Sequence, residues 1–140
     1  MMDNEVISYK ISNLQYYLSE LKKADDITWD QYRKDIRSKA FVERFLHLCI
    51  EEVLDICNRL IAFNQWREPQ SFRDLFNILN EHNVINHSDL SNFQQMASFR
   101  NLLVHRYEKI EDEIVYGIFS KRLKDFEKFI EAIKVWIRSK

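Results

Sequence analysis

Glycine and proline are almost absent from this chain, and their absence limits the folds that it can adopt. Among its 140 residues there is one glycine, Gly117, and one proline, Pro69. Tight β-hairpins and glycine-rich phosphate-binding loops need residues that tolerate positive φ angles, which glycine does most readily. Leucine, glutamate, lysine and arginine, all good helix formers, are abundant instead. The sequence therefore predicts an all-α fold.

The length and the apolar spacing predict one helical domain over residues 1–140. A chain of 140 residues can bury roughly two-thirds of the surface that it exposes when unfolded. Thr28, with Gln31 three residues later, is typical of a capping box at the start of a helix. Before it, apolar residues recur at alternating intervals of four and three, which predicts an amphipathic first helix; they are Ile7, Ile11, Leu14, Leu18 and Leu21.

Residues 40–63 carry apolar side chains on more than one stripe, which predicts a central helix covered by neighbours on several sides. His47 lies within this segment, and the pattern indicates a packed or partly exposed histidine rather than a metal ligand. Three acidic residues, Glu51, Glu52 and Asp55, follow on one side of the helix. They either face Arg100 and support it by ion pairs or face solvent.

Further helices are predicted in the second half of the chain. Ser71 is expected to cap a short helix after a proline-containing loop, and Ser88 to cap the helix that leads into residues 100–107. A last, long apolar stripe extends from Ile114 to Ile137 and contains Gly117. Glycine weakens a helix interior by about 1 kcal/mol relative to alanine, so we expect Gly117 to allow close approach of another helix.

The overall charge and hydropathy exclude several classes of protein. The formal net charge is −1, which is not typical of a dedicated nucleic-acid-binding domain, so any RNA contact must be local. No apolar run is long enough to span a membrane, and the start of the chain is unlike a signal peptide, which predicts a cytoplasmic protein. Two basic runs could contact RNA or could simply be solvated helix faces; they are Arg33, Lys34, Arg37, Lys39 and Arg44, and Lys121, Arg122 and Lys124.

The cysteines and histidines predict neither a disulfide nor a metal site. Cys49 and Cys57 are eight residues apart on one predicted helix, or about 12 Å along its axis, which is too far for a disulfide. His82 and His87 are five residues apart in a polar break, which is not the spacing of a helical metal-binding pair. We therefore expect buried thiols, no metal and no cofactor.

Residues 100–107, RNLLVHRY, hold the densest group of chemically active side chains in the sequence. Arg100 can donate a fork of hydrogen bonds to phosphate oxygens, and His105 can exchange protons near neutral pH. Asn101 and Tyr107 add an amide and a hydroxyl. These groups suggest chemistry on a phosphate ester. The alternative is an ordinary amphipathic helix end, where basic residues complement the helix dipole.

The same segment matches the R-x4-H-x-Y pattern of the HEPN ribonucleases, and the chain resembles the HepT toxins in particular. The resemblance covers about residues 5–135, because further segments follow in the family's order and spacing; they are residues 41–61, 67–69, 72–79, 96–107, 115–116 and 123–129. It implies an antiparallel HEPN-type bundle of about five helices that forms a two-fold homodimer. It also implies a metal-independent endoribonuclease toxin, with an MntA-type nucleotidyltransferase as its antitoxin partner.

The resemblance implies roles for four residues of this sequence. Arg100 and His105 would be catalytic, Asn101 would orient the substrate or His105, and Tyr107 would receive AMP groups from the antitoxin. On a regular helix, however, Arg100 and His105 point about 140° apart. Either the helix ends before His105 or a second copy of the chain completes the site, and we favour the dimer.

Two other readings of the motif remain open. In one, the protein is a non-catalytic helical partner that binds nucleotides or positions substrates for a nucleotidyltransferase. In the other, the motif only contributes to helix packing. If RNA is the substrate, we expect attack by the ribose 2′-hydroxyl, a reaction that DNA cannot undergo.

Overall fold

Within residues 2–104 and 112–140, which the computed structural model describes, the chain forms seven α-helices and no strand. The all-α prediction is confirmed, but the expected number of about five helices is wrong. The helices are α1 (Met2–Lys23), α2 (Trp29–Lys34), α3 (Ile36–Phe63), α4 (Phe72–Glu81), α5 (His87–Val104), α6 (Asp112–Lys121) and α7 (Leu123–Arg138). His105 and Tyr107 lie outside the described residues.

Two breaks that the apolar pattern does not reveal account for the additional helices. Asp35 adopts extended backbone angles and ends α2, and its carboxylate then accepts hydrogen bonds from the Arg37 backbone and the Ser38 hydroxyl to begin α3. The expected last helix is divided at Arg122, whose guanidinium binds the buried carboxylate of Asp125 at 2.8 Å. Both breaks depend on local polar contacts, which apolar periodicity does not report.

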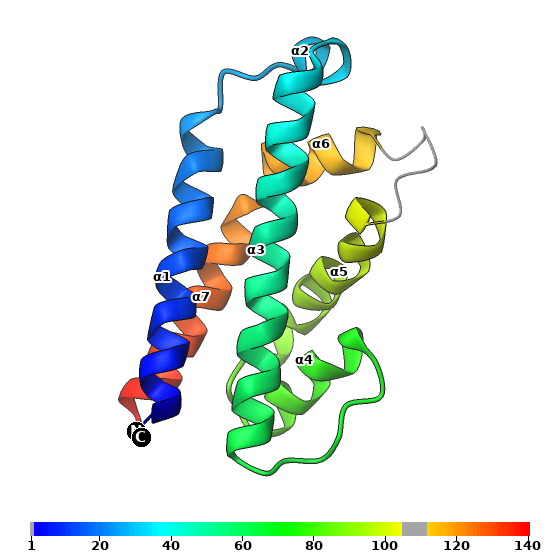
Figure 1. Ribbon diagram of the computed structural model, residues 1–140. Coiled ribbons are helices and arrows are strands. Elements are labelled where there is room, and N and C mark those ends of the chain that lie inside the picture. Colours follow the sequence, from blue (N-terminus) through cyan, green and yellow to red (C-terminus); the bar gives the residue numbers. More distant parts are fainter. Residues whose placement is uncertain (1, 105–111) are drawn as a thin grey trace.

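The helices are arranged around α3, which contacts each of the other six. Figure 1 shows α1 and α3 side by side and antiparallel, joined through α2, with α7 behind them. The helices α4 and α5 cover the other side of α3, and α6 lies near α2. None of the described helices is both long enough and apolar enough to cross a membrane.

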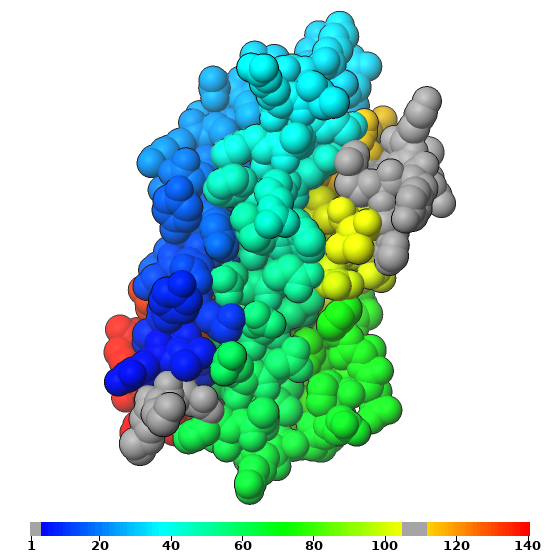
Figure 2. Space-filling view, viewed as in Figure 1, coloured from blue at the N-terminus to red at the C-terminus, as the bar shows by residue number. Residues whose placement is uncertain are grey.

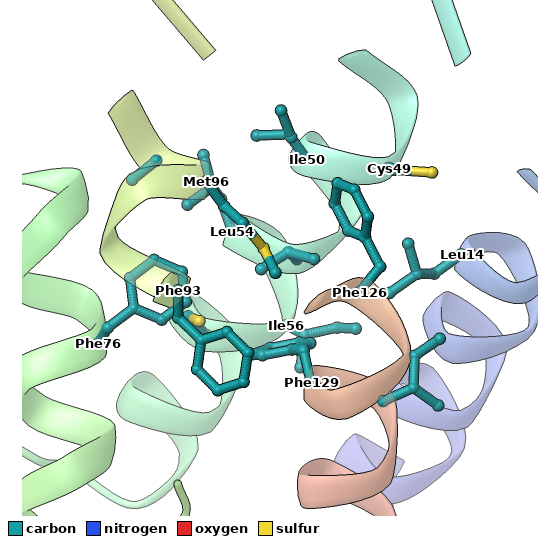
Figure 3. Close-up of a cluster of buried hydrophobic side chains, with 14 of the residues drawn as sticks. Leu14, Cys49, Ile50, Leu54, Ile56, Phe76, Phe93, Met96, Phe126 and Phe129 are labelled. Carbon is teal, nitrogen blue, oxygen red and sulfur yellow. The ribbon is translucent and has the colours of Figure 1, made fainter. Parts of the chain in front are cut away.

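The core is built from apolar side chains that α3 shares with its neighbours. Figure 3 shows side chains of α3 between those of α4 and α5 on one side and those of α1 and α7 on the other. Phe93 lies with its ring centroid 6.1 Å from Phe76 and 5.7 Å from Phe129, so three rings join α4, α5 and α7. The apolar seam predicted for the first helix is confirmed, since its members are at most 4% exposed; they are Ile7, Ile11, Leu14, Leu18 and Leu21.

The two cysteines belong to this core. Cys49 and Cys57 are both buried on α3 and both free, as the sequence predicts. Burial raises the pKa of each thiol far above its ordinary value, because the thiolate would lose its hydration. The described residues also contain no group of three or more side chains that could hold a metal ion.

Two of the three predicted helix caps are confirmed. Thr28 accepts a hydrogen bond from the Gln31 backbone at 3.1 Å, and the Gln31 side chain accepts one from the Thr28 backbone at 3.0 Å. Ser71 caps α4 through the Asp74 backbone at 3.1 Å. The expected cap at Ser88 is wrong, because α5 begins at His87 and Ser88 lies in its first turn.

The C-terminal ends of α3 and α4 share one local geometry. Gln65 and Asn83 each follow a helix with positive φ, at 57° and 62°. After α3 the Trp66 backbone donates a hydrogen bond to the Ile61 carbonyl at 3.0 Å, which completes a Schellman motif. The two ends meet where Trp66 stacks on His82, with ring centroids 4.0 Å apart.

Gly117 lies in α6 with open space around it. A Cβ atom added there would meet nothing within 4 Å among the described atoms, and its φ is not positive. Our expectation that Gly117 allows close approach of another helix is therefore wrong. The residue instead leaves α6 weaker than an alanine would.

We predict that Gln65→Gly stabilises the protein by about 1 kcal/mol, because glycine adopts the left-handed conformation without the steric cost of a Cβ atom. Thermal unfolding should show a midpoint raised by a few degrees. Gln15→Gly is the matched control, since Gln15 is exposed inside α1 and the same change there should lower stability. A lower midpoint for Gln65→Gly would contradict the prediction.

We also predict that Gly117→Ala raises the free energy of unfolding by about 1 kcal/mol, through better helix propensity at a site with room for a methyl group. Denaturant unfolding monitored by circular dichroism would measure the change. A loss of stability would show that the surroundings of Gly117 are not open.

Candidate functional site

Arg100 and Asn101 lie near the end of α5, which the structure describes as far as Val104. The Arg100 side chain is 27% exposed, and Asn101 is exposed. His105 and Tyr107 fall outside the described residues, so the catalytic pair and the modified tyrosine stay predictions. The geometry of the site is therefore that of Arg100 and the groups around it.

Arg100 is held by two other helices. Its Nε donates a hydrogen bond to Oε2 of Glu51 on α3 at 2.8 Å, which is also an ion pair. Its guanidinium carbon lies 4.8 Å from the centroid of the Phe72 ring, in the first turn of α4. The guanidinium is thus fixed at one nitrogen by charge and on one face by an aromatic ring.

These contacts leave the two terminal nitrogens of Arg100 unused. No described residue accepts a hydrogen bond from Nη1 or Nη2 of Arg100. A guanidinium held through Nε can still present both Nη groups to the oxygens of one phosphate, which is a bidentate geometry that suits arginine and phosphate. As far as residues 2–104 and 112–140 are concerned, Arg100 is therefore oriented and its Nη groups can bind an anion.

The three acidic residues of α3 divide between two neighbours. The expected support of Arg100 by Glu51 is confirmed. The same expectation is wrong for Glu52 and Asp55, which pair instead with Lys10 of α1 at 3.4 Å and 3.0 Å. Residues next to each other on a helix point about 100° apart, so Glu51 faces α5 while Glu52 faces α1.

A fourth group at this site was not predicted from the sequence. Nε2 of His47 lies 3.1 Å from Oε2 of Glu51, the same oxygen that Arg100 contacts. His47 is 27% exposed, which confirms the expectation of a partly exposed side chain. Its position four residues before Glu51 was the available signal, because residues at that spacing are neighbours on a helix.

Several side chains of the two basic runs form ion pairs with acidic neighbours. Arg33 pairs with Asp30 at 2.7 Å, and Lys39 pairs with Asp112 at 2.6 Å. Four cations of the two runs have no ion-pair partner among the described residues and lie at the surface; they are Arg37, Arg44, Lys121 and Lys124.

Arg44 belongs to the same side of α3 as the site. It precedes His47 by three residues and Glu51 by seven, so the three side chains share one helical face. Figure 2 shows α3 in the middle of this view of the surface, between α1 and α5. A nucleic-acid phosphate bound at Arg100 would thus find a second, unpaired cation along α3.

The described side chains around Arg100 could together bind a small anion. One cation is oriented by a carboxylate and an aromatic ring, and a histidine contacts that carboxylate. A family model described as "Ribonuclease HepT-like" matches residues 14–133.

Curated relatives with similar sequences are named as nucleases. The chain is 30% identical over 131 residues to the mRNA nuclease HepT of Shewanella oneidensis, covering 94% of this chain and 98% of that protein. It is 21% identical over 132 residues to the tRNA nuclease HepT of Aphanizomenon flos-aquae, covering 94% of this chain and 90% of that one.

A solved structure agrees with these matches. It contains a tri-AMPylated HEPN toxin of Shewanella oneidensis in complex with an MNT antitoxin. The described fold superposes on that toxin with a TM-score of 0.82 at 30% identity, over 93% of this chain and 97% of the toxin. The family model covers most of the chain and the Shewanella protein is matched over nearly its whole length, so this chain belongs to the Ribonuclease HepT-like family.

Proposed function

We propose that this protein is the endoribonuclease toxin of a toxin–antitoxin module, acting as one domain over residues 1–140 and as a two-fold homodimer. The observation that carries the proposal is the state of Arg100. Glu51 and Phe72 orient its guanidinium, no described residue accepts a hydrogen bond from its Nη groups, and the residue begins the R-x4-H-x-Y segment. The related proteins named as mRNA and tRNA nucleases support RNA as the substrate.

The proposed reaction is a metal-independent transesterification. His105 takes the proton of a ribose 2′-hydroxyl, and the oxygen attacks the adjacent phosphorus while Arg100 binds the phosphoryl oxygens. The bond from phosphorus to the 5′-oxygen breaks, and that oxygen takes a proton from a second acid. The products are a 2′,3′-cyclic phosphate end and a 5′-hydroxyl end. General acid–base catalysis of this kind contributes about 10²- to 10⁴-fold, and stabilisation of the phosphoryl charge about 10²-fold or more.

The dimer supplies the second acid in this proposal. On one regular helix Arg100 and His105 diverge by about 140°, so a single copy with a straight helix would not direct both at one phosphate. A two-fold axis beside the ends of the two α5 helices would bring each Arg100 near the His105 of the other copy. Asn101, exposed next to Arg100, would then orient the substrate or His105.

We predict that the purified dimer cleaves cellular mRNA or tRNA in EDTA and leaves 2′,3′-cyclic phosphate ends. Arg100→Ala should slow cleavage about 10²-fold, and His105→Ala should slow it by about 10²- to 10⁴-fold. Gel assays with identification of the product ends would measure both effects.

Two substitutions of the same chemical type serve as controls. Arg59 is exposed on α3 and has no ion pair with a described residue, and His87 is exposed at the start of α5. The variants Arg59→Ala and His87→Ala should therefore cleave RNA like the wild type. A matching DNA strand should stay intact, because it lacks the 2′-hydroxyl. Equal cleavage by all variants, or activity that depends on a metal, would contradict the mechanism.

We further propose that an MNT-type nucleotidyltransferase, the MntA-type partner that the resemblance implies, silences the toxin by AMPylating Tyr107. The Shewanella toxin, found AMPylated in complex with its MNT antitoxin, supports this form of control. The tyrosine oxygen would attack the α-phosphorus of ATP, pyrophosphate would leave, and the phenolic proton would pass to a base. Each added AMP places a negative phosphate two residues from His105, where it repels RNA and competes for Arg100.

Intact-mass and peptide analysis after incubation with the nucleotidyltransferase and ATP would locate the modification. We predict adenylyl groups on Tyr107 and none in Tyr107→Phe. Tyr9 and Tyr16 are the matched controls, because they are 68% and 59% exposed on α1 and their replacement by phenylalanine should change nothing. Labelling of either α1 tyrosine in place of Tyr107 would refute the assignment.

A further inference from the structure

His47 and Arg100 meet at a single oxygen atom. Oε2 of Glu51 lies 3.1 Å from Nε2 of His47 and 2.8 Å from Nε of Arg100. His47 and Glu51 are one turn apart on α3, whereas Arg100 comes from α5. A histidine from one helix is thus linked through one carboxylate to the cation that the proposed reaction depends on.

The shared oxygen has a direct consequence for the position of the carboxylate. A glutamate side chain rotates about three bonds, and one hydrogen bond to Arg100 would leave much of that freedom. A second donor from His47 restricts the carboxylate to the rotamers that satisfy both partners. Among the described residues, Glu51 alone accepts a hydrogen bond from Arg100, through Nε, and Phe72 contacts only a face of the guanidinium. The direction of the Nη groups therefore depends on the position of Glu51.

The contact also determines which ring nitrogen of His47 carries a proton. A carboxylate oxygen accepts hydrogen bonds and cannot donate one when ionised, so Nε2 must be the donor whether the ring is neutral or charged. Residue 47 must therefore supply one N–H group that reaches Glu51 as Nε2 of His47 does. A glutamine side chain has an amide N–H at a similar reach, whereas leucine has the bulk without the donor.

Because the three side chains are partly exposed, their contacts affect the orientation of Arg100 more than the stability of the fold. The exposed fractions of the side chains are 27% for His47, 39% for Glu51 and 27% for Arg100. Ion pairs at such positions contribute little to folding because water screens them. Orientation is affected far more, since a displacement of about 1 Å in a group that binds the transition state can slow a reaction about 10²-fold.

We propose that His47 is a positioning residue of the nuclease site, which fixes Glu51 and through it presents the Nη groups of Arg100 to the phosphate. The inference rests on the proposed ribonuclease function. It assigns His47 no contact with the RNA and no proton transfer. It gives His47 a role beside the Glu51–Arg100 ion pair, which forms without the histidine.

The kinetic test compares His47→Leu with His47→Gln on an RNA that the wild type cleaves. We expect His47→Leu to lower kcat about tenfold with little change in KM, because Arg100 would still bind RNA but stabilise the transition state poorly. His47→Gln should restore most of kcat. Combining His47→Leu with Glu51→Gln should slow cleavage no further than Glu51→Gln alone, since both changes break one chain of contacts.

Asn58→Leu is the matched control. Asn58 is exposed three turns further along the same face of α3, and its side chain has no partner among the described residues. This variant should keep the wild-type kcat. Thermal midpoints within about 2 °C of the wild type for all variants would separate orientation from folding. Wild-type kcat in His47→Leu would overturn the proposal.

A second measurement tests whether His47 positions Glu51 and Arg100, and it does not require that the protein cleaves RNA. The Nε–Hε resonance of Arg100 in ¹⁵N-labelled protein, assigned by its absence in Arg100→Lys, reports the hydrogen bond to Glu51. We expect it to shift and exchange faster with solvent in His47→Leu and to stay in place in His47→Gln. An unchanged resonance in His47→Leu refutes the inference. An inactive wild type with the expected shifts refutes the nuclease function and leaves the positioning established.

Discussion

Packing of the other described helices against α3 is the constraint on which the rest of the structure depends. This helix contacts all six others, and eleven of its residues are buried. Burial of apolar surface supplies about 25 cal/mol per Å², so the helices that cover α3 gain most of their stability from it. Arg44, His47 and Glu51 lie on a face of α3 that is not buried. The candidate site is thus built on the most firmly held element of the fold.

The contacts of Arg100 orient its guanidinium more than they stabilise the fold. A partly exposed ion pair contributes at most about 1 kcal/mol to stability, which is small beside the core. The same pair determines that Nε of Arg100 is occupied, while its two Nη groups have no hydrogen-bond acceptor among the described residues. Glu51 is therefore more important for the direction of the guanidinium than for the stability of the helix bundle. Phe72 adds a ring face that limits tilting of the guanidinium plane.

The near-neutral charge of the chain is compatible with local binding of RNA. Charges beyond about 8 Å are largely screened at physiological ionic strength, so a phosphate responds to nearby side chains rather than to the formal net charge of −1. Several cations of the two basic runs are neutralised by acidic neighbours, whereas Arg44 has no ion-pair partner among the described residues. A site with few cations would also make the proposed control by AMPylation effective, because each added phosphate would be a large change in local charge.

Much of this protein follows from sequence patterns that act locally. Scarcity of glycine and proline, the apolar seam of α1 and the caps at Thr28 and Ser71 each predict structure over a few turns, because helical hydrogen bonds connect residues four apart. The R-x4-H-x-Y segment, together with the other segments that follow in the family's order and spacing, likewise indicates the family without a fold. Tertiary structure decided which side chains meet across helices. It directed Glu51 to Arg100 and Glu52 to Lys10, divided the last helix at Arg122, and left Gly117 in open space. It also brought His47 to Glu51 and Arg100, because the angles at which helices pack depend on the whole core rather than on neighbours in sequence.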